Sequence, residues 1–76
     1  MGTEKDLVKA AHWFQQSAIG GNQDGMCLWA ECLEKGNGTE KNDAEALKWY
    51  RKSAEAGCGK AKKRVAELER QAKPAS

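Results

Sequence analysis

The side chains best suited to catalysis or metal binding are few in this sequence. It contains one histidine, His12, and three cysteines, Cys27, Cys32 and Cys58, among 76 residues. No cysteine lies at a helical spacing from His12 that would favour a nucleophile–base pair. No two cysteines form the C-x-x-C pair typical of structural zinc sites. We therefore expect no catalytic residue, no metal and no cofactor, and interpret His12 as a packing or solvent-facing side chain.

The cysteines instead predict free thiols. Their number is odd, and Cys27 and Cys32 lie five residues apart. On a helix this spacing separates the two side chains by about 140°, which prevents a bridge between them. The N-terminus also lacks the apolar segment of a signal peptide. These features indicate a reducing compartment, namely the cytoplasm if the chain is complete.

Phosphate and nucleic-acid binding find little support. The phosphate-binding motifs G-x-x-x-x-G-K-[ST] and G-x-G-x-x-G are absent, and we expect Gly36 and Gly38 to form a structural turn. The basic run Lys60–Arg64 could bind phosphate or an acidic peptide, but its side chains spread around a helix and no aromatic residue lies among them. With a net charge of only +2, we interpret the run as solvated surface and expect no nucleic-acid partner.

Length and composition define the elements that carry these residues. A 76-residue chain forms one domain at most. Five β-branched residues are too few for a sheet, whereas twelve alanines favour helices. No run approaches the ~18 apolar residues of a transmembrane helix, so we expect no membrane partner. The composition predicts an all-α domain over residues 1–72, followed by a flexible tail over residues 73–76.

An internal repeat of 36 residues organises the chain. Shifting the sequence by this period gives 11 identities over 40 aligned pairs without a gap. Trp13 falls on Trp49, and Gly2-Thr3-Glu4-Lys5 falls on residues 38–41. Each period is read as a helix, a glycine stop, a second helix and a loop. The apolar spacing predicts four helices, over 6–19, 23–35, 43–56 and 60–71.

Each of the first three helices has an expected buried stripe. The stripes comprise Leu7, Ala10, Ala11, Phe14 and Ala18; Met26, Trp29, Ala30 and Leu33; and Ala46, Leu47, Tyr50 and Ala54. Asn22 and Asn42 are predicted to cap the second and third helices, Asn42 together with Glu45 in an arrangement like a capping box. Gly57 and Gly59 are expected to break the chain before the fourth helix.

The repeat resembles a known family. The block Lys48-Trp49-Tyr50-Arg51-Lys52-Ser53-Ala54-Glu55-Ala56-Gly57 and its weaker twin at residues 10–21 are similar to the Sel-one-like repeat (SLR), a subfamily of the tetratricopeptide-like αα repeats. The resemblance implies an αα-superhelix of about two repeats that binds a protein or peptide, with no catalytic residue. Gly25, Trp29, Leu33 and Asn42 depart from the usual pattern.

The resemblance also indicates where a partner would bind. In this type of repeat the side of the first helix next to its buried stripe lines the concave surface, and here it carries Cys27, Glu31 and Glu34. The 36-residue shift maps these positions onto the last helix, at Lys63, Glu67 and Arg70. These six residues form a candidate groove of mixed charge; the alternative is that they are ordinary solvated residues.

The tryptophans indicate stacking of helices. Trp13 and Trp49 lie on a second flank of their helices, as expected for helices packed between two neighbours. We expect Trp49 to be largely buried and Trp13 to be more exposed, or covered by a partner in a weak homodimer. Trp29 belongs to a buried stripe. In the last helix, Lys62 and Glu69 replace Met26 and Leu33 of the preceding repeat, which predicts a capping helix whose outer face meets water.

These observations predict a protein–protein interaction module, an adaptor or scaffold, rather than an enzyme. Two alternatives remain open at this point. The chain could be a structural piece of a longer solenoid, or a subunit that stacks end to end. It could also be a small inhibitor or immunity-type protein that blocks one partner.

Overall fold

The computed structural model describes residues 4–72. The expected flexible tail at residues 73–76 lies outside this range, as do residues 1–3. Within it the chain forms four helices and no strand, which confirms the all-α prediction. The helices are α1 (Glu4–Ile19), α2 (Gln23–Lys35), α3 (Asp43–Glu55) and α4 (Gly59–Ala72).

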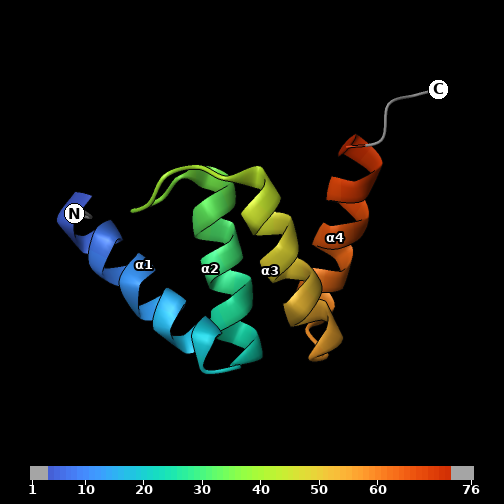
Figure 1. The fold of residues 1–76 in the computed structure, drawn as a ribbon, viewed down its shortest axis with the longest axis horizontal. Coiled ribbons are helices and arrows are strands. Elements are labelled where there is room, and N and C mark those ends of the chain that lie inside the picture. The colour runs from blue at the N-terminus through green and yellow to red at the C-terminus, as the bar shows by residue number, and fades with distance from the viewer. Residues whose placement is uncertain (1–3, 73–76) are drawn as a thin grey trace.

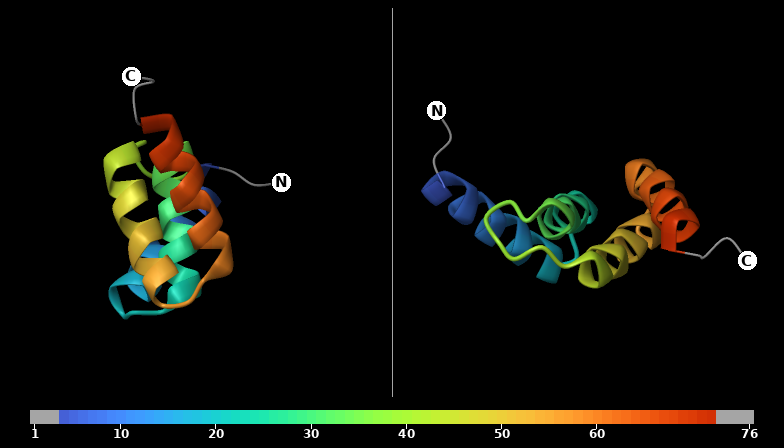
Figure 2. Two further views of the ribbon diagram at one scale, coloured as in Figure 1. Left: turned by 90° about the vertical axis from the view of Figure 1, so that its right-hand side faces the viewer. Right: turned by 90° about the horizontal axis from the view of Figure 1, so that it is seen from above.

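The helices stand side by side in sequence order, each packed against the next (Figure 1). Successive helices are antiparallel, and the molecule measures 42 × 24 × 18 Å. Seen from above, α1 and α3 form one row and α2 and α4 the other (Figure 2). This staggered order is that of stacked αα repeats, so that α3 is flanked by both α2 and α4 as expected.

Local sequence sets where the helices begin and end. The side chain of Asn22 accepts a hydrogen bond from the backbone N–H of Gly25 at 3.0 Å, and Asn42 does the same for Glu45 at 3.1 Å. Both predicted N-caps are therefore confirmed, since each satisfies a free donor of the first turn. At the C-terminus of α3 only Gly57 has a positive φ, of 108°. The expected break at Gly59 is wrong, because this residue is already the first of α4.

The loop between α2 and α3 depends on two glycines. Gly36 and Gly38 both adopt φ of 73°, which confirms the expected turn. At Gly38 a second constraint applies, because a Cβ there would collide with the backbone carbonyl of Leu7 in α1. The loop is thus held against α1 as well as bent.

Helix α2 supplies the centre of the core. All four residues of its predicted stripe are buried: Met26, Trp29, Ala30 and Leu33 are each at most 7% exposed. Neighbouring helices contribute small residues, which allow close approach of the helix axes. Helix α1 approaches α2 closely at Gly25, where a Cβ would overlap the side chain of Ser17. Gly25 is therefore required by the packing of α1 on α2.

One stripe residue is an exception. Leu7 was expected in the core but is 44% exposed. The N-terminal half of α1 diverges from α2, as Figure 1 shows, and the Gly36–Thr39 loop lies beside it. The amphipathic pattern marks the correct face of α1, but the partner helix does not extend along its whole length.

The three tryptophans have different environments. Trp29 is buried, as predicted, whereas Trp13 is 71% exposed. Trp49 was expected to be largely buried and is only partly so; it packs against the core, and the Lys52 ammonium lies 4.7 Å from its ring centroid. The exposed side of the Trp49 ring is therefore covered by a lysine side chain and not by a further helix.

The last helix meets water on its outer face, as the polar replacements predict. Lys62 is exposed, while Glu69 is half-buried and accepts a hydrogen bond from Arg51 of α3 at 2.7 Å. One of the two residues therefore links α4 to α3. The three cysteines carry free thiols, as expected.

Candidate binding groove between α2 and α4

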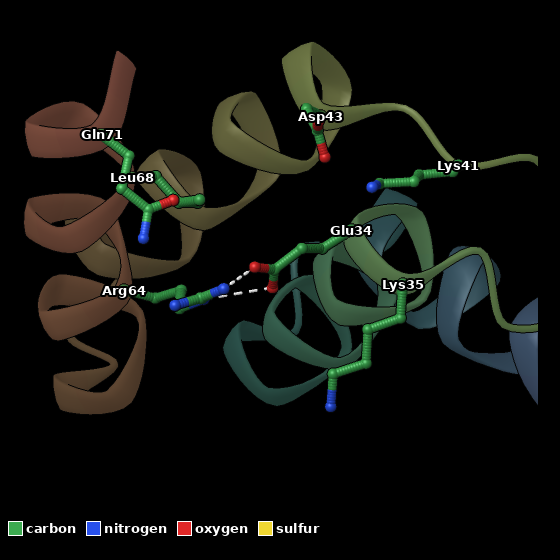
Figure 3. Close-up of a pocket in the computed structure, with 7 residues that line it drawn as sticks. All are labelled: Glu34, Lys35, Lys41, Asp43, Arg64, Leu68 and Gln71. Atoms are coloured by element: carbon green, nitrogen blue, oxygen red, sulfur yellow. Dashed lines mark hydrogen bonds and ion pairs between the residues drawn. The ribbon is translucent and has the colours of Figure 1, made fainter. Parts of the chain in front are cut away.

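The site is organised by a carboxylate on α2 that receives three contacts. Glu34 accepts a hydrogen bond from the Tyr50 hydroxyl at 3.0 Å and one from Arg64 Nε at 3.1 Å. Arg64 Nη2 pairs with the second carboxylate oxygen, so the guanidinium binds Glu34 through two nitrogens (Figure 3). The Glu34 side chain is only 13% exposed. This cluster joins α2, α3 and α4 at one point.

Tyr50 forms the floor of this cluster. Its residue surface is 1% exposed, and burial raises the pKa of its hydroxyl, with Glu31 and two cysteine thiols adding to the effect. The hydroxyl therefore stays protonated and acts as a donor to Glu34. A protonated donor at this position fixes the carboxylate in the orientation that Arg64 requires.

A second group of charges lies one turn earlier on α2. Glu31 pairs with Lys60 in the first turn of α4 at 3.5 Å and with Lys35 at 3.9 Å. Glu31, Lys60 and Lys35 line a small hollow of about 290 Å³ above Tyr50. Glu31 and Glu34 of α2 thus face cations of α4 across the gap between the two helices.

A larger hollow of about 690 Å³ adjoins the first. We name the two hollows together the α2–α4 groove. The larger one is lined by Glu34, Lys35, Lys41, Asp43, Arg64, Leu68 and Gln71. Figure 3 shows Lys41 reaching in from the α2–α3 loop, opposite Arg64 and Leu68 of α4.

The charges of this hollow are only partly compensated. Glu34 and Arg64 neutralise each other, and Lys35 has only the 3.9 Å pair with Glu31. Lys41 is exposed and forms no hydrogen bond or ion pair with any residue that the structure describes. The larger hollow therefore offers the ammonium groups of two lysines, the carboxylate of Asp43 and the apolar side chain of Leu68.

The predicted groove residues are brought together in part. Glu31 and Glu34 line the groove, and Glu67 lies at its edge, 2.9 Å from Arg64 Nη1. Lys63 and Arg70 are exposed on α4 but line neither hollow. Lys63 and Arg70 were predicted by shifting the α2 positions by one repeat. The shifted positions lie on the face of α4 that points away from α2, because the corresponding face of α2 points toward α4.

The remaining two predicted residues lie elsewhere. Cys27 is 4% exposed beneath the first turn of α4, so its side chain is not presented at the surface. Trp13 is on the far side of α1 and does not border the groove.

Several groove residues were missed by the sequence interpretation. Lys60, Arg64, Leu68 and Gln71 follow the spacing i, i+4, i+8, i+11 along α4. This spacing is the signal that would have found them, because it defines one face of the helix. The basic run at Lys60–Arg64 was interpreted as solvated surface, whereas its first and last members pair with the α2 carboxylates.

Within residues 4–72, no cluster of three or more histidine, cysteine, aspartate or glutamate side chains is arranged to hold a metal ion. In the same range, no helix combines the length and apolar character needed to cross a bilayer.

Comparison with known proteins agrees with the repeat seen in the structure. The Sel1 repeat model matches residues 1–22 and 23–58. The boundary between the two matches falls just before α2, and the second match spans α2, α3 and the connection to α4. No curated protein and no solved structure gave a match. The two matches cover more than half of the chain. The chain therefore belongs to the Sel1 repeat family, whose repeats serve in general as protein–protein interaction modules.

Proposed function

We propose that this protein is an adaptor that binds a short segment of a partner protein in the α2–α4 groove, and that it does so without catalysis. The observation that carries the proposal is the larger hollow, in which the unpaired Lys41 stands opposite Leu68 and the weakly paired Lys35 also lines the wall (Figure 3). Membership of an interaction-repeat family supports it.

The lining of the groove defines the chemistry of the partner. Two ammonium groups favour a carboxylate, and Leu68 favours an apolar side chain next to it. We therefore propose a peptide segment in which an acidic residue neighbours an apolar one. Glu34 and Arg64 act as positioning residues beneath it, while Glu31, Glu67, Lys63 and Arg70 offer rim contacts to longer segments.

A nucleic acid fits this surface less well than a peptide does. Glu31, Glu34 and Asp43 place negative charge among the groove cations, and such charge opposes a phosphate backbone. The only aromatic side chain in the lining is Tyr50, which is 1% exposed and offers no stacking platform.

Selection from a random peptide library displayed on phage tests the proposal. We expect the selected peptides to be enriched in acidic residues next to apolar ones. The double variant Lys35→Glu/Lys41→Glu should weaken binding of a selected peptide by ~10-fold or more. The double variant Lys9→Glu/Lys48→Glu makes the same charge change on the exposed surfaces of α1 and α3, outside both hollows, and should leave the affinity unchanged. Peptides without acidic residues, or equal effects of all these substitutions, would refute the proposal.

A second function is favoured by the exposed face of α1. In the inner repeat the face formed by Ala46, Tyr50 and Ser53 is buried, and Ser53 donates a hydrogen bond to the Gln23 carbonyl of α2 at 2.7 Å. The same positions one repeat earlier, Ala10, Phe14 and Ser17, are only half-buried, and Trp13 beside them is 71% exposed. We propose that this face of α1 supports weak self-association, in which two copies meet through α1.

The polar end of the array favours such a two-fold contact. In a head-to-tail stack, α4 of one copy would take the place of α2 and would bring the exposed Lys62 against the apolar face of α1. A contact between two α1 faces avoids burying this charge. Sedimentation equilibrium tests it: Trp13→Gln should weaken the dimer, whereas Lys62→Gln should not. A chain that stays monomeric at high concentration, or a dimer that needs Lys62, would refute it.

We further propose that the protein works in a reducing compartment, the cytoplasm. The odd number of cysteines, all three of which carry free thiols in the structure, supports this assignment. Fractionation of the source cells with an antibody against the chain tests it directly, and recovery from an extracellular fraction would refute it.

A further inference from the structure

Cys58 occupies an N-cap position. It is the residue immediately before α4, and its backbone carbonyl accepts the first hydrogen bond of that helix, from Lys62 N at 3.1 Å. Its counterpart one repeat earlier is Asn22, the N-cap of α2, which binds the N–H of Gly25. The Cys58 sulfur accepts from the equivalent N–H, that of Ala61. A thiol therefore stands where the preceding repeat has a capping amide.

A second thiol contacts this cap. Cys27 lies on α2, is 4% exposed, and its sulfur is hydrogen-bonded to the sulfur of Cys58. An independent contact fixes the same two elements together, since Lys60 in the first turn of α4 pairs with Glu31, one turn after Cys27 on α2, at 3.5 Å. Cys58 itself packs against the edge of the core to which Cys27 belongs.

The two thiols differ in their surroundings. The N–H of Ala61, with further hydrogen bonds from Cys27 and from the backbone of Lys60, lowers the pKa of Cys58. Desolvation, assisted by the nearby Cys58, raises the pKa of Cys27 to about 11. Cys58 is half-exposed and loses its proton more readily than Cys27, which is buried. Such asymmetry is typical of a reactive thiol beside a resolving one.

We propose that Cys27 and Cys58 form a reversible dithiol–disulfide pair, with a low-molecular-weight disulfide such as oxidised glutathione as the oxidant. The Cys58 thiolate attacks one sulfur of the oxidant; the S–S bond breaks, a mixed disulfide forms and one small thiolate leaves. Cys27 then loses its proton to solvent and attacks the Cys58 sulfur, releasing the second small thiolate. Two protein thiols are oxidised to one disulfide, and one small disulfide is reduced to two thiols.

The third cysteine provides an internal control. Cys32 is buried five residues further along α2, and desolvation raises the pKa of its thiol. Neither of the other cysteines is hydrogen-bonded to it. It should therefore remain a free thiol while the pair reacts.

The test uses the full, reduced chain exposed to oxidised glutathione, followed by alkylation of the remaining thiols and peptide mass spectrometry. We expect a bridge between the peptides of Cys27 and Cys58, alkylated Cys32, and recovery of three thiols with dithiothreitol. Glutathione persisting on Cys58, a bridge that includes Cys32, or three unreacted thiols would overturn the proposal.

Variants assign the two roles. Cys32→Ser should still form the bridge. Cys27→Ser should stop at the mixed disulfide, with at least ~10-fold more glutathione held on Cys58 than in the parent chain. In Cys58→Ser, where serine keeps the cap, Cys27 should react at least ~10-fold more slowly than Cys58 does in the parent. Circular dichroism shows whether each serine variant folds. If one does not, Cys27→Ala or Cys58→Asn takes its place. Equal reactivity of Cys27 and Cys58 would exclude the assigned order of attack.

Discussion

Tyr50 donates its hydroxyl proton to Glu34 across 3.0 Å, although the two residues lie 16 positions apart on different helices. The same carboxylate is bound by Arg64 of α4. Side chains from three successive helices are therefore bound to one another beneath the groove. A substitution at each position tests its contribution separately.

The first prediction concerns this cluster. Tyr50→Phe removes only the hydroxyl and should lower the free energy of unfolding by ~1 kcal/mol, because Glu34 keeps its contacts with Arg64. Glu34→Ala should cost more, ~2–3 kcal/mol, because it leaves the buried hydroxyl of Tyr50 unpaired and leaves Arg64 with only Glu67 as a partner. Urea denaturation measures both. Glu55→Ala, on the exposed end of α3, is the control and should change stability by less than ~0.5 kcal/mol. A Tyr50→Phe variant less stable than Glu34→Ala would contradict the assigned contacts.

The second prediction concerns the α2–α3 loop. Gly36→Ala and Gly38→Ala should each cost more than ~1 kcal/mol, since a Cβ resists the positive φ of both residues. Gly38→Ala should be the worse of the two, because its Cβ also meets the Leu7 carbonyl. In Gly59→Ala the new Cβ meets nothing within 4 Å and the backbone is helical, so this control should be neutral or slightly stabilising. Thermal unfolding monitored by circular dichroism ranks the stability of the three variants. An equal loss of stability in Gly59→Ala would show that the positive φ of Gly36 and Gly38 is not the cause.

The third prediction ranks the tryptophans. Trp29→Ala should cost ~3–5 kcal/mol, as expected for a buried aromatic residue. Trp49→Ala should cost less, because its ring is only partly buried. Trp13→Ala should cost least in the monomer, since this side chain is 71% exposed. Guanidinium unfolding at low protein concentration gives the order, and a loss at Trp13 equal to that at Trp29 would contradict the described packing.

The fourth prediction is a loss of stability in alkaline solution. The pKa of Cys27 is raised from 9.0 to about 11 by burial, and that of Tyr50 is raised from 10.0 for the same reason. The native state thus holds these protons more tightly than the unfolded chain does. The contribution of Cys27 to stability is fully present below pH 9.0 and is lost as the pH rises through about 11, whereas that of Tyr50 is fully present below pH 10.0 and is lost only at still higher pH. Urea titrations at several pH values should show a shallower decline in Cys27→Ala than in the parent chain, and an unchanged slope would show that Cys27 does not contribute.

The sequence predicts much of the fold because local patterns, namely N-caps and the spacing of apolar residues, determine where each helix lies. Asn22 and Asn42 mark helix starts through contacts only three residues long, and the spacing of Met26, Trp29 and Leu33 identifies the buried face of α2. Such signals need no knowledge of how the helices are placed. This is why the four predicted helices agree with the observed ones within two residues at each end.

The groove could be predicted only in part, because it depends on how helices are oriented. Glu31 and Glu34 were found from the stripe on α2, but Arg64 and Lys60 were not. The face of α2 that carries the two glutamates points toward α4, whereas its repeat equivalent on α4 points away from α2. The cations that pair with the glutamates lie on a different face of α4. Leu7 shows the same limit, because periodicity gives the direction of a side chain but not the length over which two helices stay in contact.

The contrast between the two ends of the array has a practical consequence for engineering. An added helix preceding α1 would be received by Trp13, Phe14 and small side chains, whereas one following α4 would have to accommodate Lys62. The array is therefore directional: extension ahead of α1 needs only a matching apolar helix, while extension beyond α4 first requires Lys62 to be replaced by an apolar residue such as the methionine that the preceding repeat carries at Met26.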